Sequence, residues 1–285
     1  MATVRVKKKD MGIVKSMGEI VRERMNECTD AGAQQFIGSI RPIYGSTENG
    51  NPIHIGTCIL LEIENHKYLL TAAHVIDENE YSSLYVGGKS KVILIEGDFL
   101  CTKKPEGGRD NDHYDFAWLQ LSDQLIEKIG NVCFAQEKQL SYYNGQPEGT
   151  LYLALGYPNT KNKKINTQEK SIKPHYMKYA STVKQNEVLR QKLAISGKDH
   201  LFLEYNPKHS KDEEGKIVNS IAPRGISGGA LIDMGNIANP DSYIPNAPCN
   251  GQIAGMLIEN HKDCKAMSAV KIGVIVEQIK KNNAL

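Results

Sequence analysis

The sequence predicts an all-β protein of the sandwich or barrel type. Short runs rich in apolar and β-branched residues recur along the chain, and segments that favour turns separate them. Such spacing, without helices between successive strands, is typical of antiparallel architectures rather than of parallel sheets. We expect strands at residues 35–40, 56–63, 67–73, 83–86, 91–96, 116–121, 150–155, 200–205, 229–232, 252–258 and 265–271.

Helices are expected before and after these strands. From Asp10 to Cys28 apolar residues recur at three- and four-residue steps with charges between them, which is the pattern of an amphipathic helix. A basic tail, residues 1–10, precedes it. Residues 273–281 show the same spacing and end in lysines, which suit a helix C-terminus. We expect the first helix to pack against the body of the protein, with a partner interface as the alternative.

Residues 159–196 break the strand pattern and are interpreted as an insertion or a long surface loop, with a short helix at 184–194. A run of lysines in this segment could bind nucleic acid. The net charge of the whole chain is only +2, however, and such a run is usually a solvated loop, so we expect no nucleic-acid partner. The lysines are Lys161, Lys163, Lys164, Lys170 and Lys173.

The cysteines and the apolar segments bear on the cellular compartment. No stretch approaches the roughly 18 apolar residues of a membrane span, and no signal peptide is recognisable. The six cysteines form no C-x-x-C pair, and we expect them to be reduced thiols buried singly in a cytoplasmic protein. They are Cys28, Cys58, Cys101, Cys133, Cys249 and Cys264.

Ser227 lies in a glycine-rich segment that could carry a nucleophile. A serine hydroxyl needs a base to remove its proton and donors to stabilise the oxyanion that forms. Gly225 and Gly228 allow the tight turn that would point the N–H groups of Gly225 and Ser227 into one cavity, and the chain then continues as a strand. A glycine-rich hairpin turn explains this segment equally well when it is considered alone.

Two further residues lie at the ends of predicted strands. His74 follows two alanines at the end of one strand, where small side chains leave room for an imidazole. Asp115 directly precedes an apolar strand, where a half-buried carboxylate could accept the Nδ1–H of a histidine and select its tautomer. Asp110 and Asp112 are close to it in sequence but belong to a polar loop.

Together these segments resemble the trypsin-like (chymotrypsin-fold) serine peptidases, and the resemblance extends over roughly residues 34–283. The order of the three side chains is also the order found in that family. The matching motifs are Thr71-Ala72-Ala73-His74, Asp115-Phe116-Ala117 and Gly225-Ile226-Ser227-Gly228-Gly229.

The resemblance implies a fold and a set of roles. The fold would be two six-stranded antiparallel β-barrels, at residues 34–140 and 141–285, preceded by the tail and helix at 1–33. Ser227 would be the nucleophile, His74 the general base and then acid, and Asp115 the group that orients the imidazole. The amides of Gly225 and Ser227 would form the oxyanion hole. The substrate would be a protein or peptide, and no cofactor or metal would be required.

The chain departs from the family pattern at several positions. Secreted animal members carry a cysteine where this chain has Val75, and an aspartate where it has Ile226. In zymogen-type members that aspartate pairs with a newly cut N-terminus, so we expect no activation by that route. The family alignment places Ile221 at the base of the primary specificity pocket, which predicts an apolar pocket. The predicted wall of that pocket is Gly255, Met256 and Leu257, followed by Ile258.

Alternative functions differ in how they explain Ser227. An α/β-hydrolase elbow is disfavoured, because that fold needs the order Ser, Asp, His and a helix after the serine. A catalytically silent protease fold that serves as a binding scaffold is the stronger alternative. By resemblance, a member of this kind without signal peptide or disulfides looks bacterial. It could be a regulated effector, for example in defence against phage, that needs an activating protein partner.

Overall fold

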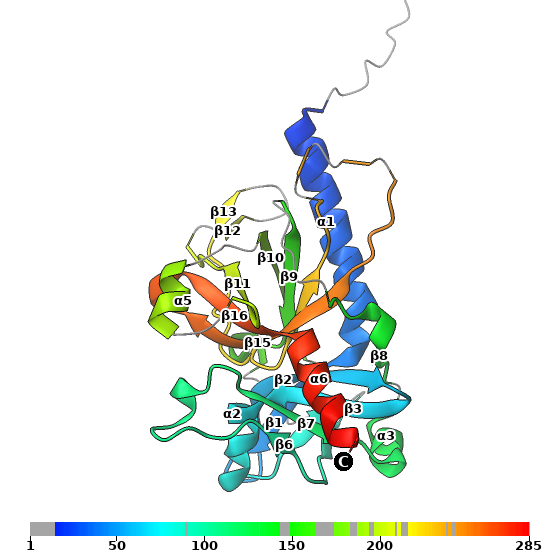
Figure 1. Ribbon diagram of the computed structural model, residues 1–285, viewed down its shortest axis with the longest axis vertical. Coiled ribbons are helices and arrows are strands. Elements are labelled where there is room, and N and C mark those ends of the chain that lie inside the picture. The colour runs from blue at the N-terminus through cyan, green and yellow to red at the C-terminus, as the bar shows by residue number, and fades with distance from the viewer. Residues whose placement is uncertain are drawn as a thin grey trace, which may run out of the picture.

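Most strands of the described residues belong to two sheets, which are antiparallel except for the pair β2 with β8 and lie one below the other in Figure 1. The computed structural model describes residues 15–88, 91–130, 132–142, 149–162, 174–182, 187–193, 197–208, 210–211, 216–237, 239–240, 243–244 and 246–284. The predicted basic tail, the first residues of the predicted helix and four of the five lysines in the insertion lie outside these ranges.

The first sheet has the strand order β5-β4-β1-β2-β3-β7-β6, and β8 pairs with β2. Its centre is formed by the long β2 and its neighbours β1 and β3, whose inward-facing side chains are fully buried. The strands are β1 (Ile40–Ser46), β2 (Pro52–Ile63), β3 (His66–Ala72), β4 (Tyr85–Gly87), β5 (Val92–Leu94), β6 (Leu100–Cys101), β7 (Phe116–Gln120) and β8 (Ala135–Gln136).

The second sheet has six strands among the described residues, in the order β10-β9-β14-β15-β16-β11. A separate pair, β12 with β13, lies outside it. The strands are β9 (Leu151–Gly156), β10 (Met177–Thr182), β11 (His200–Glu204), β12 (Ser210–Lys211), β13 (Ile217–Val218), β14 (Ala230–Asp233), β15 (Gln252–His261) and β16 (Ala266–Lys271). The predicted all-β class is confirmed, although the first sheet has eight paired strands in the described ranges rather than six.

Two local predictions were wrong. The strand expected at 35–40 begins only at Ile40, because the preceding helix continues to Phe36 and a 3-10 turn, Ile37–Ser39, follows it. The insertion contains β10, which pairs along its whole length with β9 and so extends the second sheet. Exposure alternates along β10, but its residues, Met-Lys-Tyr-Ala-Ser-Thr, do not alternate between apolar and polar, so the sequence gave no strand signal there.

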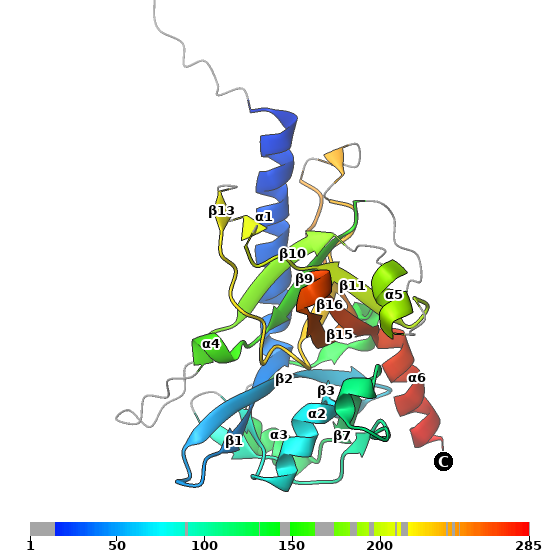
Figure 2. The ribbon, with the colours of Figure 1, turned by 90° about the vertical axis from the view of Figure 1, so that its left-hand side faces the viewer.

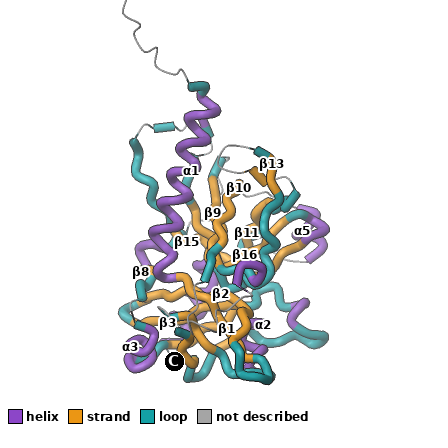
Figure 3. The backbone as a smooth tube through the Cα atoms, turned by 180° about the vertical axis from the view of Figure 1, so that it is seen from behind, coloured by secondary structure: helices purple, strands orange, loops and turns teal. Residues whose placement is uncertain are grey.

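The first helix, α1 (Met17–Phe36), is amphipathic as predicted but starts and ends later than the sequence suggested. It begins at the capping box of Ser16 and Glu19, in which each side chain accepts a backbone N–H of the other residue. It packs on the second sheet, beside β9 and β10 (Figures 2 and 3). Gly32 allows this close contact, because a Cβ there would lie 2.7 Å from the sulfur of Met234.

The last helix, α6 (Ile272–Asn283), follows β16 and crosses to the first sheet (Figure 1). The Asn283 side chain donates a hydrogen bond to the Tyr68 hydroxyl of β3 at 2.7 Å. The apolar face of α6, with Ile275 and Ile279, joins a core that contains residues of both sheets.

The remaining α-helices of the described residues are α2 (Ala73–Asp77), α3 (Asp123–Ile129), α4 (Asn159–Asn162) and α5 (Glu187–Leu193). Within the described ranges, none of the helices combines the length and apolar character that crossing a membrane requires.

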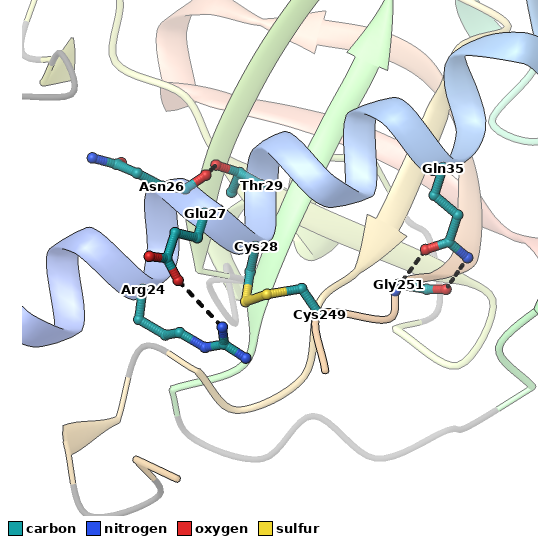
Figure 4. The surroundings of a disulfide bond; sticks show 8 residues. All are labelled: Arg24, Asn26, Glu27, Cys28, Thr29, Gln35, Cys249 and Gly251. Atoms are coloured by element: carbon teal, nitrogen blue, oxygen red, sulfur yellow. Dashed lines mark hydrogen bonds and ion pairs between the residues drawn. A yellow bond between two sulfur atoms is a disulfide. The ribbon is translucent and has the colours of Figure 1, made fainter. Parts of the chain in front are cut away.

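A disulfide bond joins Cys28 of α1 to Cys249, which lies in the segment leading into β15 (Figure 4). The expectation of six reduced cysteines was therefore wrong. These two residues are 221 positions apart in sequence, but the packing of α1 brings their Cα atoms to 4.8 Å. Gln35 holds the same segment by exchanging two 3.1 Å hydrogen bonds with the backbone of Gly251 (Figure 4). The cytoplasmic location, which was inferred partly from reduced thiols, stays a prediction.

The disulfide predicts a thiol count and a stability change. Unfolding without reductant should expose four reactive thiols, and reduction should raise the number to six. Cys28→Ser should lower the free energy of unfolding by about 2–4 kcal/mol, because the unfolded chain loses a cross-link that closes a long loop. Cys101→Ser, which removes an exposed free thiol, is the matched control. Six reactive thiols in the protein unfolded without reductant would contradict the assignment.

Candidate active site

His74 lies in the first turn of α2, directly after β3 ends. Ala72 and Ala73 are completely buried, so the chain can turn against the sheet without displacing a larger side chain. Val75 then packs on Gly56 of β2, where a Cβ would lie 2.6 Å from a Val75 methyl group. Val75 thus fills the position at which secreted members of the resembled family carry a cysteine. The His74 side chain itself is 40% exposed.

Asp115 lies immediately before β7 and holds His74 by two contacts. One carboxylate oxygen accepts the backbone N–H of His74 at 2.9 Å, and the other lies 2.5 Å from His74 Nδ1. A carboxylate only accepts hydrogen bonds when ionised, so Nδ1 carries the proton and Nε2 is left with a free lone pair. The Asp115 carbonyl also accepts the N–H of Ala73 at 3.0 Å, which fixes the strand end against the start of α2.

The pKa of His74 is raised above its ordinary value of 6.5. Burial by itself lowers the pKa, because it disfavours the charged imidazolium. The hydrogen bond to Asp115, its negative charge and the charge of Asp77 outweigh that effect, and Arg109 opposes them weakly. The site is therefore built to stabilise a positive charge on His74.

A network of ion pairs that the sequence did not predict supports Asp115. Asp115 has a φ of +42°, a left-handed conformation that a non-glycine residue adopts only when its surroundings hold it there. Asp112 supplies this support, because one of its oxygens accepts the N–H groups of Tyr114 and Asp115 at 3.2 and 3.0 Å. Its other oxygen pairs with Arg109 at 2.6 Å, and Arg109 also binds Asp77 at 2.9 Å.

The Ser227 turn approaches the first sheet so closely that two of its residues must be glycine. Gly225 and Gly228 have φ values of +92° and +84°. A Cβ at Gly228 would lie 1.9 Å from the Thr57 carbonyl oxygen and 2.5 Å from the Thr71 hydroxyl. Because Thr71 is in β3, three residues before His74, the structure brings the Ser227 turn to the end of the strand that carries His74.

The N–H group of Gly225 is oriented through the Arg224 carbonyl, which belongs to the same peptide unit. The carbonyl of Arg224 accepts the backbone N–H of Asn159 at 2.7 Å. Since a peptide is planar and trans, fixing this carbonyl also fixes the opposed N–H of Gly225. The Gly225 N–H itself donates to no group among the described residues.

The N–H group of Ser227 is oriented in the same way. The carbonyl of Ile226, in the same peptide unit, accepts the N–H of Gly229 at 2.8 Å. The Ser227 N–H likewise has no acceptor in the described part of the chain, while the Ser227 carbonyl accepts the N–H of Thr57 at 2.9 Å. Two oriented and unused donors therefore lie two residues apart in this turn.

Ile226 is buried in the apolar cluster of the second sheet. One of its methylene carbons would lie 2.6 Å from a Cβ at Gly156, so the side chain fills the space above that glycine. No carboxylate is present at this position to pair with a newly cut N-terminus. The turn is held instead by hydrophobic packing and backbone hydrogen bonds.

The four residues expected to line a specificity pocket fall into two groups. Ile221 is half-buried against the apolar cluster that contains Leu257, and its carbonyl accepts the Tyr205 hydroxyl. Leu257 also pairs through its backbone with the Ser227 turn, at 2.7 and 2.8 Å. Met256 and Leu257 are both enclosed, Met256 in the core shared by the two sheets and Leu257 in the apolar cluster of the second sheet. A Cβ at Gly255 would clash with a carbonyl of β16.

The two main sheets are those expected of a serine protease of the chymotrypsin fold, and the family match gives the same class. A family model described as Trypsin matches residues 32–258, which is most of the chain. The chain belongs to the trypsin family, and this membership supports a serine endopeptidase that acts on proteins.

Two of the solved structures that are similar to the chain are also proteases. One is a Glu endopeptidase, at 18% identity over 87% of this chain and 91% of that one, with a TM-score of 0.47. The other is the serine protease domain of the Sesbania mosaic virus polyprotein, at 14% identity over 84% of this chain and 91% of that one, with a TM-score of 0.45. A search among curated proteins found no match.

The histidines should titrate separately in an NMR experiment. His74 is expected to titrate above 6.5, because Asp115 favours its charged form, whereas burial should hold the pKa of His54 and of His261 to about 4. Asp115→Asn should move only the His74 midpoint, and should move it down, because the negative charge is lost. A His74 midpoint that Asp115→Asn leaves unchanged would contradict the pairing.

Proposed function

We propose that Ser227, His74 and Asp115 act as a catalytic triad that cleaves peptide bonds through an acyl-enzyme. Ser227 Oγ attacks the scissile carbonyl carbon while His74 Nε2 accepts its proton, and Asp115 stabilises the resulting imidazolium. The imidazolium then protonates the leaving amine. A water molecule, activated by the same imidazole, hydrolyses the acyl-enzyme and restores Ser227. The observation that carries this proposal is the 2.5 Å contact of His74 Nδ1 with Asp115, which leaves Nε2 as the base.

The two unused N–H groups, of Gly225 and Ser227, support the same proposal. We assign them the role of the oxyanion hole for the tetrahedral intermediate. Each such donor is worth about 3 kcal/mol of transition-state stabilisation, because it is oriented before the charge develops. The peptide units behind both donors are already anchored by hydrogen bonds, and Ile226 cannot bind a new N-terminus. We therefore propose that the hole forms without N-terminal cleavage.

The division of the chain is also part of this proposal. We assign residues 34–140 to a first barrel that carries His74 and Asp115, and residues 141–285 to a second that carries Ser227. The order of the strands supports this division: β1–β8 of the first sheet end at Gln136, and β9, the first strand of the second sheet, starts at Leu151. Residues 1–33 precede the first barrel, and α1 continues three residues beyond that boundary.

The pocket for the residue before the cleaved bond is proposed to be apolar. Ile221 and Leu257 support this, because both contact the same apolar cluster beside the Ser227 turn. We also assign Gly255 and Met256 to the wall of this pocket, although Met256 is enclosed and Gly255 is crowded by β16.

A regulated bacterial effector is the finer role that we propose. A site that needs no N-terminal cleavage requires other control, either a narrow specificity or a partner that completes it. The burial of Ile226 in place of a carboxylate supports this role. The resemblance described above supports it as well, except for the expected lack of disulfides, which the Cys28–Cys249 bond contradicts.

Profiling of a peptide library should reveal the pocket preference. We expect cleavage after apolar or neutral residues, with Ile221→Asp shifting the preference toward Lys and Arg by adding a negative charge at the pocket base. Val218→Asp, an exposed position on β13, is the matched control for the added charge. A strict requirement of the wild type for Lys or Arg would rule out an apolar pocket.

Labelling with a fluorophosphonate probe tests the triad directly. The wild type should be labelled, and Ser227→Ala and His74→Ala should each abolish labelling, because the probe reacts only with an activated serine. Asp115→Asn should reduce turnover about 10⁴-fold through the wrong histidine tautomer. A wild type labelled only after addition of cell lysate would indicate control by a partner. A folded wild type that remains unlabelled in both conditions would favour the scaffold function instead.

A further inference from the structure

His54, in β2, is a buried histidine that the proposed mechanism does not use. Its Nδ1 lies 2.5 Å from the side-chain oxygen of Asn159, the first residue of α4. Its ring packs edge-on against Tyr44 of the neighbouring strand, with the ring centres 5.6 Å apart. The contact with Asn159 links the two sheets, because β2 belongs to the first sheet and α4 follows β9 of the second.

The protonation of His54 follows from its partners. A carboxamide oxygen accepts hydrogen bonds, so His54 Nδ1 must donate and Nε2 must be unprotonated in the neutral ring. Nε2 is buried and has no hydrogen-bond partner among the described residues, which makes a second proton unfavourable there. Burial accordingly lowers the pKa of His54 to about 4. Near neutral pH the ring is therefore a fixed, uncharged donor aimed at Asn159.

Asn159 is also the residue that anchors Gly225. Its backbone N–H binds the Arg224 carbonyl at 2.7 Å, in the peptide unit that contains the Gly225 N–H. Its side-chain oxygen lies against Gly225, since a Cβ there would be only 1.8 Å from it. The oxygen that His54 binds thus touches the residue that provides one of the two oxyanion donors.

We propose that His54 is a positioning residue for the oxyanion hole: by holding the Asn159 carboxamide against Gly225, it keeps the Arg224–Gly225 peptide in the orientation that presents the Gly225 N–H to the oxyanion. This inference rests on the proposed protease function.

The anchor is needed because glycine does not enforce the orientation by itself. Gly225 has no side chain, and its left-handed φ is only one of the conformations open to it. If the peptide unit rotated by half a turn, the Arg224 carbonyl would replace the N–H and would repel a negative charge. The substrate would still bind along the strands, while the transition state would lose a donor. The loss should therefore appear in kcat and not in KM.

The test compares purified full-length variants on a peptide substrate selected from the library. His54→Phe removes the donor and keeps an aromatic ring, and we expect kcat to fall about 10- to 100-fold with KM within about twofold of the wild type. The affinity for a peptide trifluoromethyl ketone, which forms an oxyanion on Ser227, should fall by the same factor as kcat. His54→Gln, whose amide can donate to Asn159, should recover much of the loss.

Two further variants separate positioning from general damage. Tyr44→Phe removes a buried hydroxyl from the same ring contact without touching Asn159, and it should keep wild-type kcat. Asn159→Ala should reproduce the kcat loss of His54→Phe, and the double variant should lose no more than either single one, because both break the same link. Should His54→Phe fail to fold, Asn159→Ala and His54→Gln carry the comparison.

The outcomes separate this inference from the proposed function. Ser227-dependent turnover with unchanged kcat in both His54→Phe and Asn159→Ala would overturn the inference alone. A loss in KM rather than in kcat, or an unchanged affinity for the ketone, would do the same. The absence of any Ser227-dependent turnover in the wild type, with or without lysate, would overturn the proposed function and this inference together.

Discussion

Thr57, fully buried in β2, makes four hydrogen bonds at the site, and three of them join the first sheet to the second. Its N–H binds the Ser227 carbonyl at 2.9 Å and its hydroxyl binds the Gly225 carbonyl at 3.0 Å. The hydroxyl also accepts the N–H of Tyr157 at 3.0 Å, and the Thr57 carbonyl accepts the Thr71 hydroxyl at 2.7 Å. These bonds hold the Ser227 turn against β2 and β3, the second of which ends directly before α2 and His74.

Charge and backbone geometry are coupled in the other half of the site. The left-handed backbone of Asp115 turns its carboxylate toward His74, and the ion pairs of Asp112 with Arg109 hold that backbone from outside. Because Arg109 and Asp112 are largely shielded from water, at 12% and 6% side-chain exposure, removal of one partner would leave a poorly solvated charge. The backbone conformation of Asp115, which contacts His74 directly, is thus held by Asp112 and Arg109, two residues with no hydrogen bond to His74 among the described residues.

The sequence predicted those features that depend on residues close to one another in the chain. Strand ends, the alanines before His74 and the glycines around Ser227 are short-range signals, and the all-β class followed from turn spacing. The other determinants are contacts between distant segments. Cys28 and Cys249 are 221 residues apart, and His54 and Asn159 are 105 apart. No spacing rule marks such residues, since only the packing of α1 and of the two sheets makes them neighbours.

The helix α1 precedes the first sheet in the chain, yet it docks on the second, while α6 follows the second sheet and binds the first (Figure 1). The two halves are therefore crossed by helices in both directions. During synthesis α1 emerges without a surface to cover, because β9, β10 and Cys249 come more than a hundred residues later. The docking of α1 therefore has to follow the synthesis of the second sheet, and the Cys28–Cys249 disulfide can form only when most of the chain has been made.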